Sequence, residues 1–445
     1  MKNDEKGLFH TAQTSFQFLF SKTDEKALDE QIEEGLPESI KSLAIEYPEI
    51  LPGKDFPEKE IIRLDLINNF GALIIKMDGD HRPNHVFSSE NLLAIVKAID
   101  GVCKSENGFW GGMEHNIFGC FLPEKDCESS LKIAKRIQTE LSEKSDQTLS
   151  IGIACYPFIE YAKSQILINA KKALDHAGFF GPSSVVVFDA VSLNISGDNF
   201  YHHGDIHSAI AEFETALKID PENVNVLNSL GVCYADLGDF EKALLQFEKA
   251  INISPEEVMA WYNTGLTYKL MKNNEKALQF FLKAEDLDGK IFEVAFQTGK
   301  IYFELGNPKE GKKYYQKAIA LESDNGPNYR FLGECYAGLD LIDEAIGAYK
   351  NAVKVNPNDA HSLSALGNLF DKKGENPEIA MVFCRQSIEI SPENGLFRNR
   401  LGSLYLKQNR LDEAILEFEK ANELGFDSSL EIQKTKSLMQ EQNKN

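Results

Sequence analysis

The stretch FWGGMEHNIFGCFLP, residues 109–123, holds residue types that could do chemistry. Apolar segments on both sides of a polar middle predict two strands joined by a turn. Gly111 and Gly112 precede Glu114, and glycine allows a backbone to approach a phosphate group closely. An acidic residue beside such a turn supplies the oxygen ligand that Mg²⁺ prefers. These residues therefore raise the question of a nucleotide site, or of the remains of one.

A second group of candidate ligands follows the apolar segment ALIIKMD, residues 72–78, which we expect to be a buried strand. Asp78 and Asp80 stand at its end, and His81 and His85 come next. One or two carboxylates could hold a single Mg²⁺ ion weakly, whereas imidazole together with carboxylate suits zinc. The alternative is that the histidines lie exposed in a loop.

Strands and helices alternate around these residues. Helical spacing is found at 58–69, 89–99, 129–144 and 165–178, and strand-like runs at 72–78, at 149–157 and in FFGPSSVVVFD, which ends at residue 189. Such alternation predicts an α/β (α+β) sheet with helices packed on it. The first half of the chain is therefore expected to be a sheet domain with flanking helices.

Read together, these elements resemble a GGDEF domain, the catalytic module of diguanylate cyclases, over residues 55–189. ALIIKMDGDH is similar to the family's first strand and its Asp-x-Asp-His ending, and LSIGIACYP to its Ser-Ile-Gly-Ile-Ala strand. AKKALDHAGFFGPSSVVVFD follows the family's last helix, hairpin and strand. The resemblance implies the family's fold and a bacterial signalling context. It lies mostly at framework positions, which carry fold rather than activity.

The positions at which the family does its chemistry differ in this chain. Large side chains replace both glycines of the motif, and they obstruct the approach of nucleotide phosphates. An isoleucine replaces an acidic residue and cannot ligate a hard cation. Counted back from Pro123, the Gly-Gly-Asp-Glu-Phe motif falls on Glu114, His115, Asn116, Ile117 and Phe118.

Further departures affect the rest of the nucleotide site. Lys171 stands for the family's metal-side Asp, Gly178 for its phosphate-facing Lys, and Pro182 for the Arg of its Gly-Arg-Asn turn. The alternative register uses Gly111 and Gly112 literally and still lacks the aspartate. Phosphoryl transfer needs metal ions together with cationic phosphate contacts. The resemblance therefore implies a degenerate, catalytically inactive domain without a cofactor, whose vestigial metal ligands are Asp78 and Asp80.

The second half of the chain repeats itself every 34 residues. Small residues at two fixed positions let two helices approach closely, and aromatic residues fill the space beside them, so no single copy can bury its own apolar face. The glycines are Gly197, Gly231, Gly265, Gly299, Gly333, Gly367 and Gly402. The aromatic residues sixteen positions later are Phe213, Phe247, Phe281, Tyr315, Tyr349 and Phe418, with Cys384 as the exception in the sixth copy.

This pattern resembles the tetratricopeptide repeat (TPR), a helix–turn–helix unit of about 34 residues. The resemblance implies seven repeats over residues 190–428, stacked as an all-α superhelix (α-solenoid). Prolines follow several second helices, where the missing amide donor stops the helix. Residues 429–445 are expected to form a polar capping helix. The repeats begin near residues 190, 224, 258, 292, 326, 360 and 395.

The first helices of such repeats line a groove that, in this family, binds an extended peptide or a helix of a partner protein. Aromatic residues next to cations suit a peptide that carries apolar anchors and acidic groups. The alternative is that several of these side chains only pack between repeats or face water. The expected groove residues are Asn194, Asn228, Tyr262, Lys269, Phe296, Lys300, Phe303 and Arg330.

Composition limits the classes of partner and compartment. The 445 residues carry a formal net charge of −22, which argues against binding to nucleic acid or to an anionic membrane. No stretch approaches the roughly 20 apolar residues that span a bilayer. The seven cysteines are scattered and form no CxxC, which predicts buried thiols in a reducing cytoplasm rather than a disulfide or zinc framework. We therefore expect a cytoplasmic protein, and a homo-oligomer is compatible with its sequence.

Three functions compete on these grounds. The first is a scaffold, in which the repeats bind a partner and the inactive domain is a docking module. The second is a nucleotide-responsive protein whose degenerate domain still binds GTP or a cyclic dinucleotide, and the third is an active cyclase. The replaced motif positions argue against the third and weaken the second. The expected segments are a helical linker at 1–54, the GGDEF-like domain at 55–189, the repeats at 190–428 and the cap at 429–445, with a rigid junction near 189–191.

Overall fold

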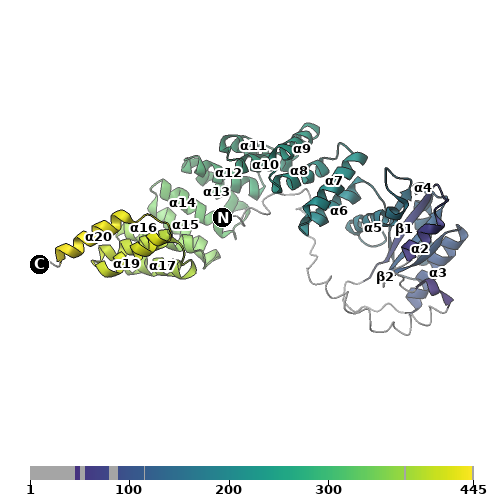
Figure 1. Cartoon of the computed structure of the whole chain (residues 1–445), viewed down its shortest axis with the longest axis horizontal. Helices are drawn as coiled ribbons and strands as arrows, with labels where there is room; N and C mark the ends of the chain where they lie inside the picture. Colours follow the sequence, from purple (N-terminus) through teal and green to yellow (C-terminus); the bar gives the residue numbers. More distant parts are fainter. Residues whose placement is uncertain (1–45, 51–55, 80–88, 115, 375–376, 443–445) are drawn as a thin grey trace. The chain divides into compact units, whose positions relative to one another are not determined.

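The computed structural model describes residues 46–50, 56–79, 89–114, 116–374 and 377–442. The chain forms two compact units, residues 1–255 and 256–445. The first unit holds a sheet and the first helix pairs, and the second holds the later helix pairs (Figure 1). Most of the segment 1–54 lies outside the described residues, as do Asp80, His81, His85 and His115.

Within the described part of the first unit, five strands form one sheet in the order β2-β3-β1-β4-β5. β4 and β5 pair in parallel, and the other neighbours pair antiparallel. The central position of β1 agrees with its apolar run from Phe70 to Ile75, because a strand buried on both faces needs no polar alternation. The strands are β1 (Phe70–Met77), β2 (Phe109–Glu114), β3 (Ile117–Pro123), β4 (Leu149–Tyr156) and β5 (Val185–Val187).

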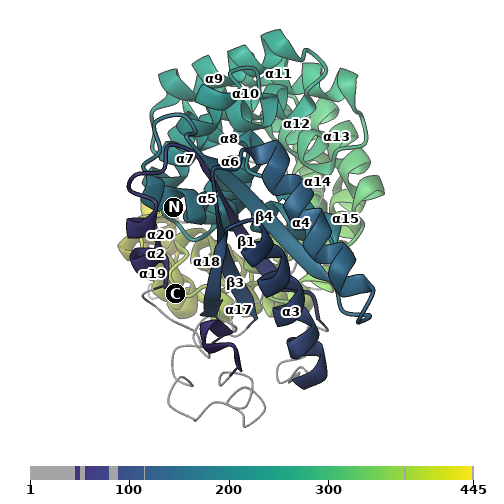
Figure 2. The same ribbon diagram turned by 90° about the vertical axis from the view of Figure 1, so that its right-hand side faces the viewer.

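Helices cover both faces of the sheet. Leu73 and Ile75 of β1 face α3 and α4, whereas Ala72 and Ile74 face α5, because successive strand residues point to opposite sides. Figure 2 shows α3 and α4 over the same face. The helices of this region are α2 (Phe56–Arg63), α3 (Ser89–Ser105), α4 (Cys127–Ser142) and α5 (Ile166–Ala177), with short 3₁₀ turns η1 (Pro48–Ile50), η2 (Lys163–Gln165) and η3 (Gly178–Phe180).

Antiparallel helix pairs make up the rest of the chain. Their first helices begin at the residues at which the 34-residue period places the repeat starts. The pairs are α6 (Ala190–His202) with α7 (Ile206–Ile219), α8 (Val224–Asp236) with α9 (Phe240–Ile253), α10 (Val258–Leu270) with α11 (Asn274–Leu287), α12 (Phe292–Glu304) with α13 (Pro308–Leu321), α14 (Gly326–Gly338) with α15 (Ile342–Val355), α16 (Ala360–Lys373) with α17 (Pro377–Ile390), and α18 (Gly395–Lys407) with α19 (Leu411–Glu423). The last helix is α20 (Ser429–Gln442), which packs on α19.

The repeated glycines lie directly against the aromatic residues that follow them. A Cβ atom added to Gly231 would lie 2.5 Å from the ring of Phe247, so no larger residue fits without a shift of the ring. In the sixth pair a Cβ atom on Gly367 would lie 2.4 Å from the sulfur of Cys384, which takes the place of the ring. The 34-residue spacing of these glycines therefore reflects one helix–helix contact that recurs in each pair.

The sheet and the first helix pairs share one hydrophobic core. Leu174 of α5, Leu193 of α6 and Phe213 of α7 belong to the same buried cluster as the inner face of β1. β5 ends two residues before Asp189, whose carboxylate caps α6 by accepting a hydrogen bond from the amide of Ser192 at 2.8 Å. The chain thus passes from the sheet to the first helix pair without a linker.

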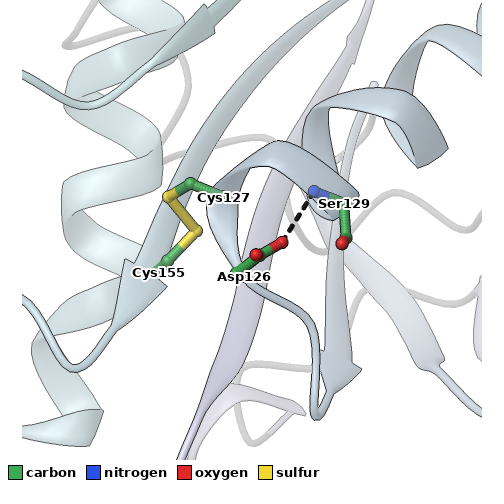
Figure 3. Close-up of a disulfide and its surroundings, with 4 residues drawn as sticks. All are labelled: Asp126, Cys127, Ser129 and Cys155. Carbon is green, nitrogen blue, oxygen red and sulfur yellow. Dashed lines mark hydrogen bonds between the residues drawn. A yellow bond between two sulfur atoms is a disulfide. The ribbon is translucent and has the colours of Figure 1, made fainter.

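Cys127 at the start of α4 and Cys155 on β4 form a disulfide, with their Cα atoms 5.7 Å apart (Figure 3). The prediction that no disulfide forms is therefore wrong. The disulfide forms because α4 packs on β4, which brings together two cysteines that are 28 residues apart in sequence. The other cysteines are buried thiols, as predicted: Cys103, Cys120, Cys233, Cys335 and Cys384. Cytoplasmic location stays a prediction, and the cysteines no longer support it. No helix of the described ranges is long and apolar enough to cross a membrane.

Candidate functional site

β2 and β3 form the hairpin that the sequence predicts at 109–123. Gly111 pairs with Gly119 and Gly112 pairs with Phe118, and both glycines of β2 are buried. The register shifts by a bulge between Gly112 and Glu114. The glycine pair therefore lies within β2 and not in the turn that follows it.

Ile117, which the resemblance to GGDEF domains aligns with an acidic metal ligand, lies in β3. Its side chain is only 6% exposed and belongs to the apolar cluster that α5 covers. An aliphatic group in a core has no lone pair to offer a cation. The position therefore contributes to packing and not to a metal site.

Asp78, which was predicted from the sequence as a vestigial metal ligand, directly follows β1, and its carboxylate accepts hydrogen bonds from the protein. One carboxylate oxygen accepts from the Thr148 hydroxyl and from the Ser183 amide, both at 2.8 Å, and the other accepts from the Ser150 hydroxyl at 2.7 Å. The carboxylate thus ties β1 to β4 and to the turn before β5. No group of three or more potential metal-ligating side chains is found in the described ranges, from which Asp80 is missing.

After β4, the resemblance to GGDEF domains draws attention to Lys171, Gly178 and Pro182. Lys171 forms an exposed ion pair with Asp175 on α5, with 2.9 Å between nitrogen and oxygen. Gly178 has no side chain, and Pro182 has no amide hydrogen to donate. Of these three residues Lys171 alone carries a positive charge, and Asp175 pairs with it.

The residues expected to line the groove divide into buried and half-buried groups. Asn194, Asn228 and Tyr262 are buried, at 5%, 1% and 1% exposure, so they pack inside their repeats as the alternative interpretation proposed. Asn194 also donates a hydrogen bond to Asp198 at 3.2 Å. The half-buried group consists of Lys269, Phe296, Lys300, Phe303 and Arg330, all in residues 256–445.

An aromatic cluster formed by α12, α13 and α14 includes Phe296 of this half-buried group. The rings of Phe296 and Phe331 meet edge to face at 5.7 Å, and Phe331 stacks on Tyr315 at 5.5 Å. The guanidinium of Arg330 lies over Phe331, 4.9 Å from its ring centre, and 3.6 Å from a carboxylate oxygen of Asp359. This surface combines apolar area with a cation, the combination that protein interfaces favour.

A cavity of about 210 Å³ lies farther along the same row of first helices, between α16, α17 and α18. This cavity was not predicted from the sequence. Residues 34 and 69 positions after Arg330 are Ser364 and Asn399, so continuing the groove positions past the inserted residue of the sixth repeat would have led to it. Its polar lining residues are Asn368, Asp371, Asn399, Arg400 and Ser403.

Comparisons with known proteins bear on the helical part of the chain. Comparison with curated proteins gives no match. YrrB, described as a TPR protein with an unusual peptide-binding site, is 22% identical with a TM-score of 0.39, over 42% of this chain and 95% of that one. MamA is 26% identical with a TM-score of 0.34, over 37% and 96%. PilF of Pseudomonas aeruginosa is 18% identical with a TM-score of 0.43, over 47% and 95%.

Family models identify the repeats directly. Models of the tetratricopeptide repeat match residues 196–256, 260–291, 292–325 and 397–424. Together with the helix pairs and their glycine–aromatic contacts, these matches show that the helical half of the chain carries tetratricopeptide repeats.

Proposed function

We propose that the chain is an interaction scaffold that binds a partner protein through the first helices of its repeats. The observation that carries this proposal is the surface in residues 256–445, where α12 contacts α14 and α16 contacts α18, so that first helices lie side by side. Lys300, Phe303 and Arg330 are half-buried on these helices. Aromatic and cationic side chains of this kind dominate binding energy at interfaces. A partner segment with apolar anchors and acidic groups would complement them.

We further propose that the sheet domain is a degenerate GGDEF-like module that serves docking and not catalysis. The hydrogen bonds to Asp78 and the burial of Ile117 support this, because neither residue is left to clamp a metal ion against phosphates. The core that the sheet shares with α6 and α7 supports a rigid connection to the repeats.

The scaffold proposal is tested by selecting peptides from a random library on the immobilised full chain. Lys300→Glu reverses the charge of the proposed surface on α12, and we expect it to weaken the selected peptides about tenfold, which corresponds to about 1.4 kcal/mol. Lys309→Glu on α13 makes the same change on an exposed second helix and should leave binding unchanged. Failure to select any peptide, or equal binding by both variants, would contradict the proposal.

The proposal for the sheet domain is tested by calorimetric titration of the full chain with GTP and Mg²⁺, followed by chromatography of the incubated mixture. We expect neither binding nor product. Binding without product would support the nucleotide-responsive alternative. A cyclic dinucleotide product would contradict the proposed loss of catalysis.

A further inference from the structure

Arg400 of α18 is a half-buried guanidinium that makes no ion pair with a carboxylate of the described residues, and Glu334 of α14 attracts it from a longer distance. Its Nη1 atom donates a hydrogen bond to the Ser364 hydroxyl on α16 at 2.8 Å. No carboxylate among the described residues lies within 4.0 Å of its nitrogen atoms, whereas the guanidinium of Arg398, two residues earlier, lies 3.0 Å from Glu417. Burial lowers the pKa of Arg400 below its ordinary value, a sign that this charge has lost hydration.

The cavity beside Arg400 contains further hydrogen-bonding groups and one carboxylate that is already neutralised. An oxygen of Asp371 lies 2.7 Å from the ammonium nitrogen of Lys407, so this acid pairs with another cation. Asn368 and Ser403 line the same cavity and make no hydrogen bond through their side chains to the described residues. The site thus combines a guanidinium that makes no ion pair within 4.0 Å in the described structure with side chains that can donate to oxygen.

The proposed scaffold function supplies the setting for this inference, which identifies a class of ligand for one part of the same surface. We propose that the cavity between α16 and α18 binds the side-chain carboxylate of an aspartate or glutamate in an extended acidic segment of a partner protein. Arg400 would make charge-assisted hydrogen bonds to it, and a desolvated guanidinium gains most from such a partner. At about 210 Å³ the cavity has room for a carboxylate and the methylene group that carries it.

The row of cations favours a side-chain carboxylate over the carboxylate of a chain end. Lys300 on α12 and Arg330 on α14 are half-buried, three and two repeats before Arg400 respectively, in the same compact unit. A segment with acidic residues along its length can meet several of these cations, whereas a chain end supplies one carboxylate. The occupant is therefore an internal acidic segment.

The probe is a fluorescein-labelled octaglutamate with an amidated C-terminus, titrated into the full chain and followed by anisotropy. Octaglutamine with an amidated C-terminus is the uncharged control, and octaglutamine with a free C-terminus tests the chain end. We expect the wild-type chain to bind octaglutamate and neither control. Non-specific attraction cannot produce this result, because the chain itself carries a net charge of −22.

Arg400→Gln keeps a hydrogen-bond donor near Ser364 and removes the charge, and it should weaken octaglutamate about tenfold. Arg398→Gln removes a neighbouring charge that is already paired with Glu417, and it should leave the affinity within about twofold. If Arg400→Gln does not fold, Asn368→Asp places a carboxylate in the cavity and should weaken the peptide equally.

Three outcomes would overturn the inference: no binding of octaglutamate, equal binding by Arg400→Gln, or binding of octaglutamine through its free C-terminus. These results are distinct from failure of the scaffold function, which is judged by whether the random library yields peptides that depend on Lys300. The selected peptides could lack acidic residues and bind the Arg400→Gln variant as well as the wild type. That result would support the scaffold proposal and contradict the proposal of an acidic ligand.

Discussion

Lys172 on α5 donates hydrogen bonds to both carboxylate oxygens of Glu212 on α7, at 2.6 and 2.7 Å. Both side chains are largely buried, at 15% and 17% exposure. The pair joins a helix of the sheet domain to the first repeat above the hydrophobic core that the two share. The sheet and the first repeat are thereby held by a charged contact as well as by apolar packing.

Lys172→Met should lower the local stability of α6 and α7 by about 1 to 3 kcal/mol, because it leaves the Glu212 carboxylate partly buried and unpaired. Amide hydrogen exchange of the full chain measures this loss as faster exchange in α7. Lys171→Met is the matched control, since its pair with Asp175 has side chains 44% and 45% exposed and is expected to contribute little. Equal effects of the two substitutions would show that the contact does not stabilise the junction.

Gly333→Ala should destabilise the fifth repeat, since the added Cβ would lie 2.9 Å from the ring of Tyr349. Forcing a methyl group into a packed contact costs about 1 to 3 kcal/mol. Gly347→Ala in the same repeat is the control, because nothing lies within 4 Å of its Cβ position and alanine favours a helix by about 0.5 to 1 kcal/mol. Thermal unfolding of the two variants should therefore shift in opposite directions, and a shift in the same direction would contradict the contact.

The repeats could be predicted from the sequence because their signal is a local contact made many times. Gly231 and Phe247 lie on neighbouring helices only sixteen residues apart, so the spacing of residue types carries the geometry directly. The strands of the sheet were predicted for a related reason: β1 and β4 are apolar runs bounded by turn residues. Local pattern and local structure agree in these elements.

The details that the sequence did not yield depend on contacts between distant elements. Asp78 was predicted from the sequence as a metal ligand. In the structure its carboxylate accepts a hydrogen bond from the amide of Ser183, which lies 105 residues later in the chain. Cys127 and Cys155 fit no spacing motif, and only the packing of α4 on β4 brings them together. Arg400 could not be singled out from the sequence, because its contact with Ser364 and its place beside the cavity depend on the packing of α18 on α16.

The disulfide between Cys127 and Cys155 should survive purification without reductant. Alkylation of the denatured chain, followed by mass spectrometry, should then modify the five buried thiols of the described structure and leave these two linked in one peptide pair. Cys127→Ser should lower the stability of the oxidised chain by about 2 to 4 kcal/mol, because the cross-link restricts the unfolded state. Modification of all seven cysteines, with no loss of stability in the variant, would contradict the bond.

Asp198 of α6 gives the first repeat a pH-dependent stability. Burial raises the pKa of this carboxyl to about 7, although the Ser229 hydroxyl donates to it at 3.3 Å and opposes the shift. A carboxyl whose pKa is higher in the folded state stabilises the fold below its unfolded pKa near 4, and this stability is lost as the pH rises through 7. The loss is on the order of 3 to 4 kcal/mol for a shift of this size.

Asp198→Asn should remove this dependence and make the chain more stable than wild type at pH 8, with the difference shrinking toward pH 5. The amide is tolerated because the buried Oδ1 atom of Asn194 has no hydrogen-bond partner in the described structure and can accept from it. Thermal unfolding between pH 5 and 8 measures the difference in stability between variant and wild type. The contributions of other titrating groups cancel in this difference. Asp205→Asn is the control, since hydrogen bonds from Ser208 lower the pKa of that exposed capping carboxylate and keep its titration below this range. A pH-independent difference for Asp198→Asn would mean that its carboxyl is already charged at pH 5 and that α6 accommodates the charge.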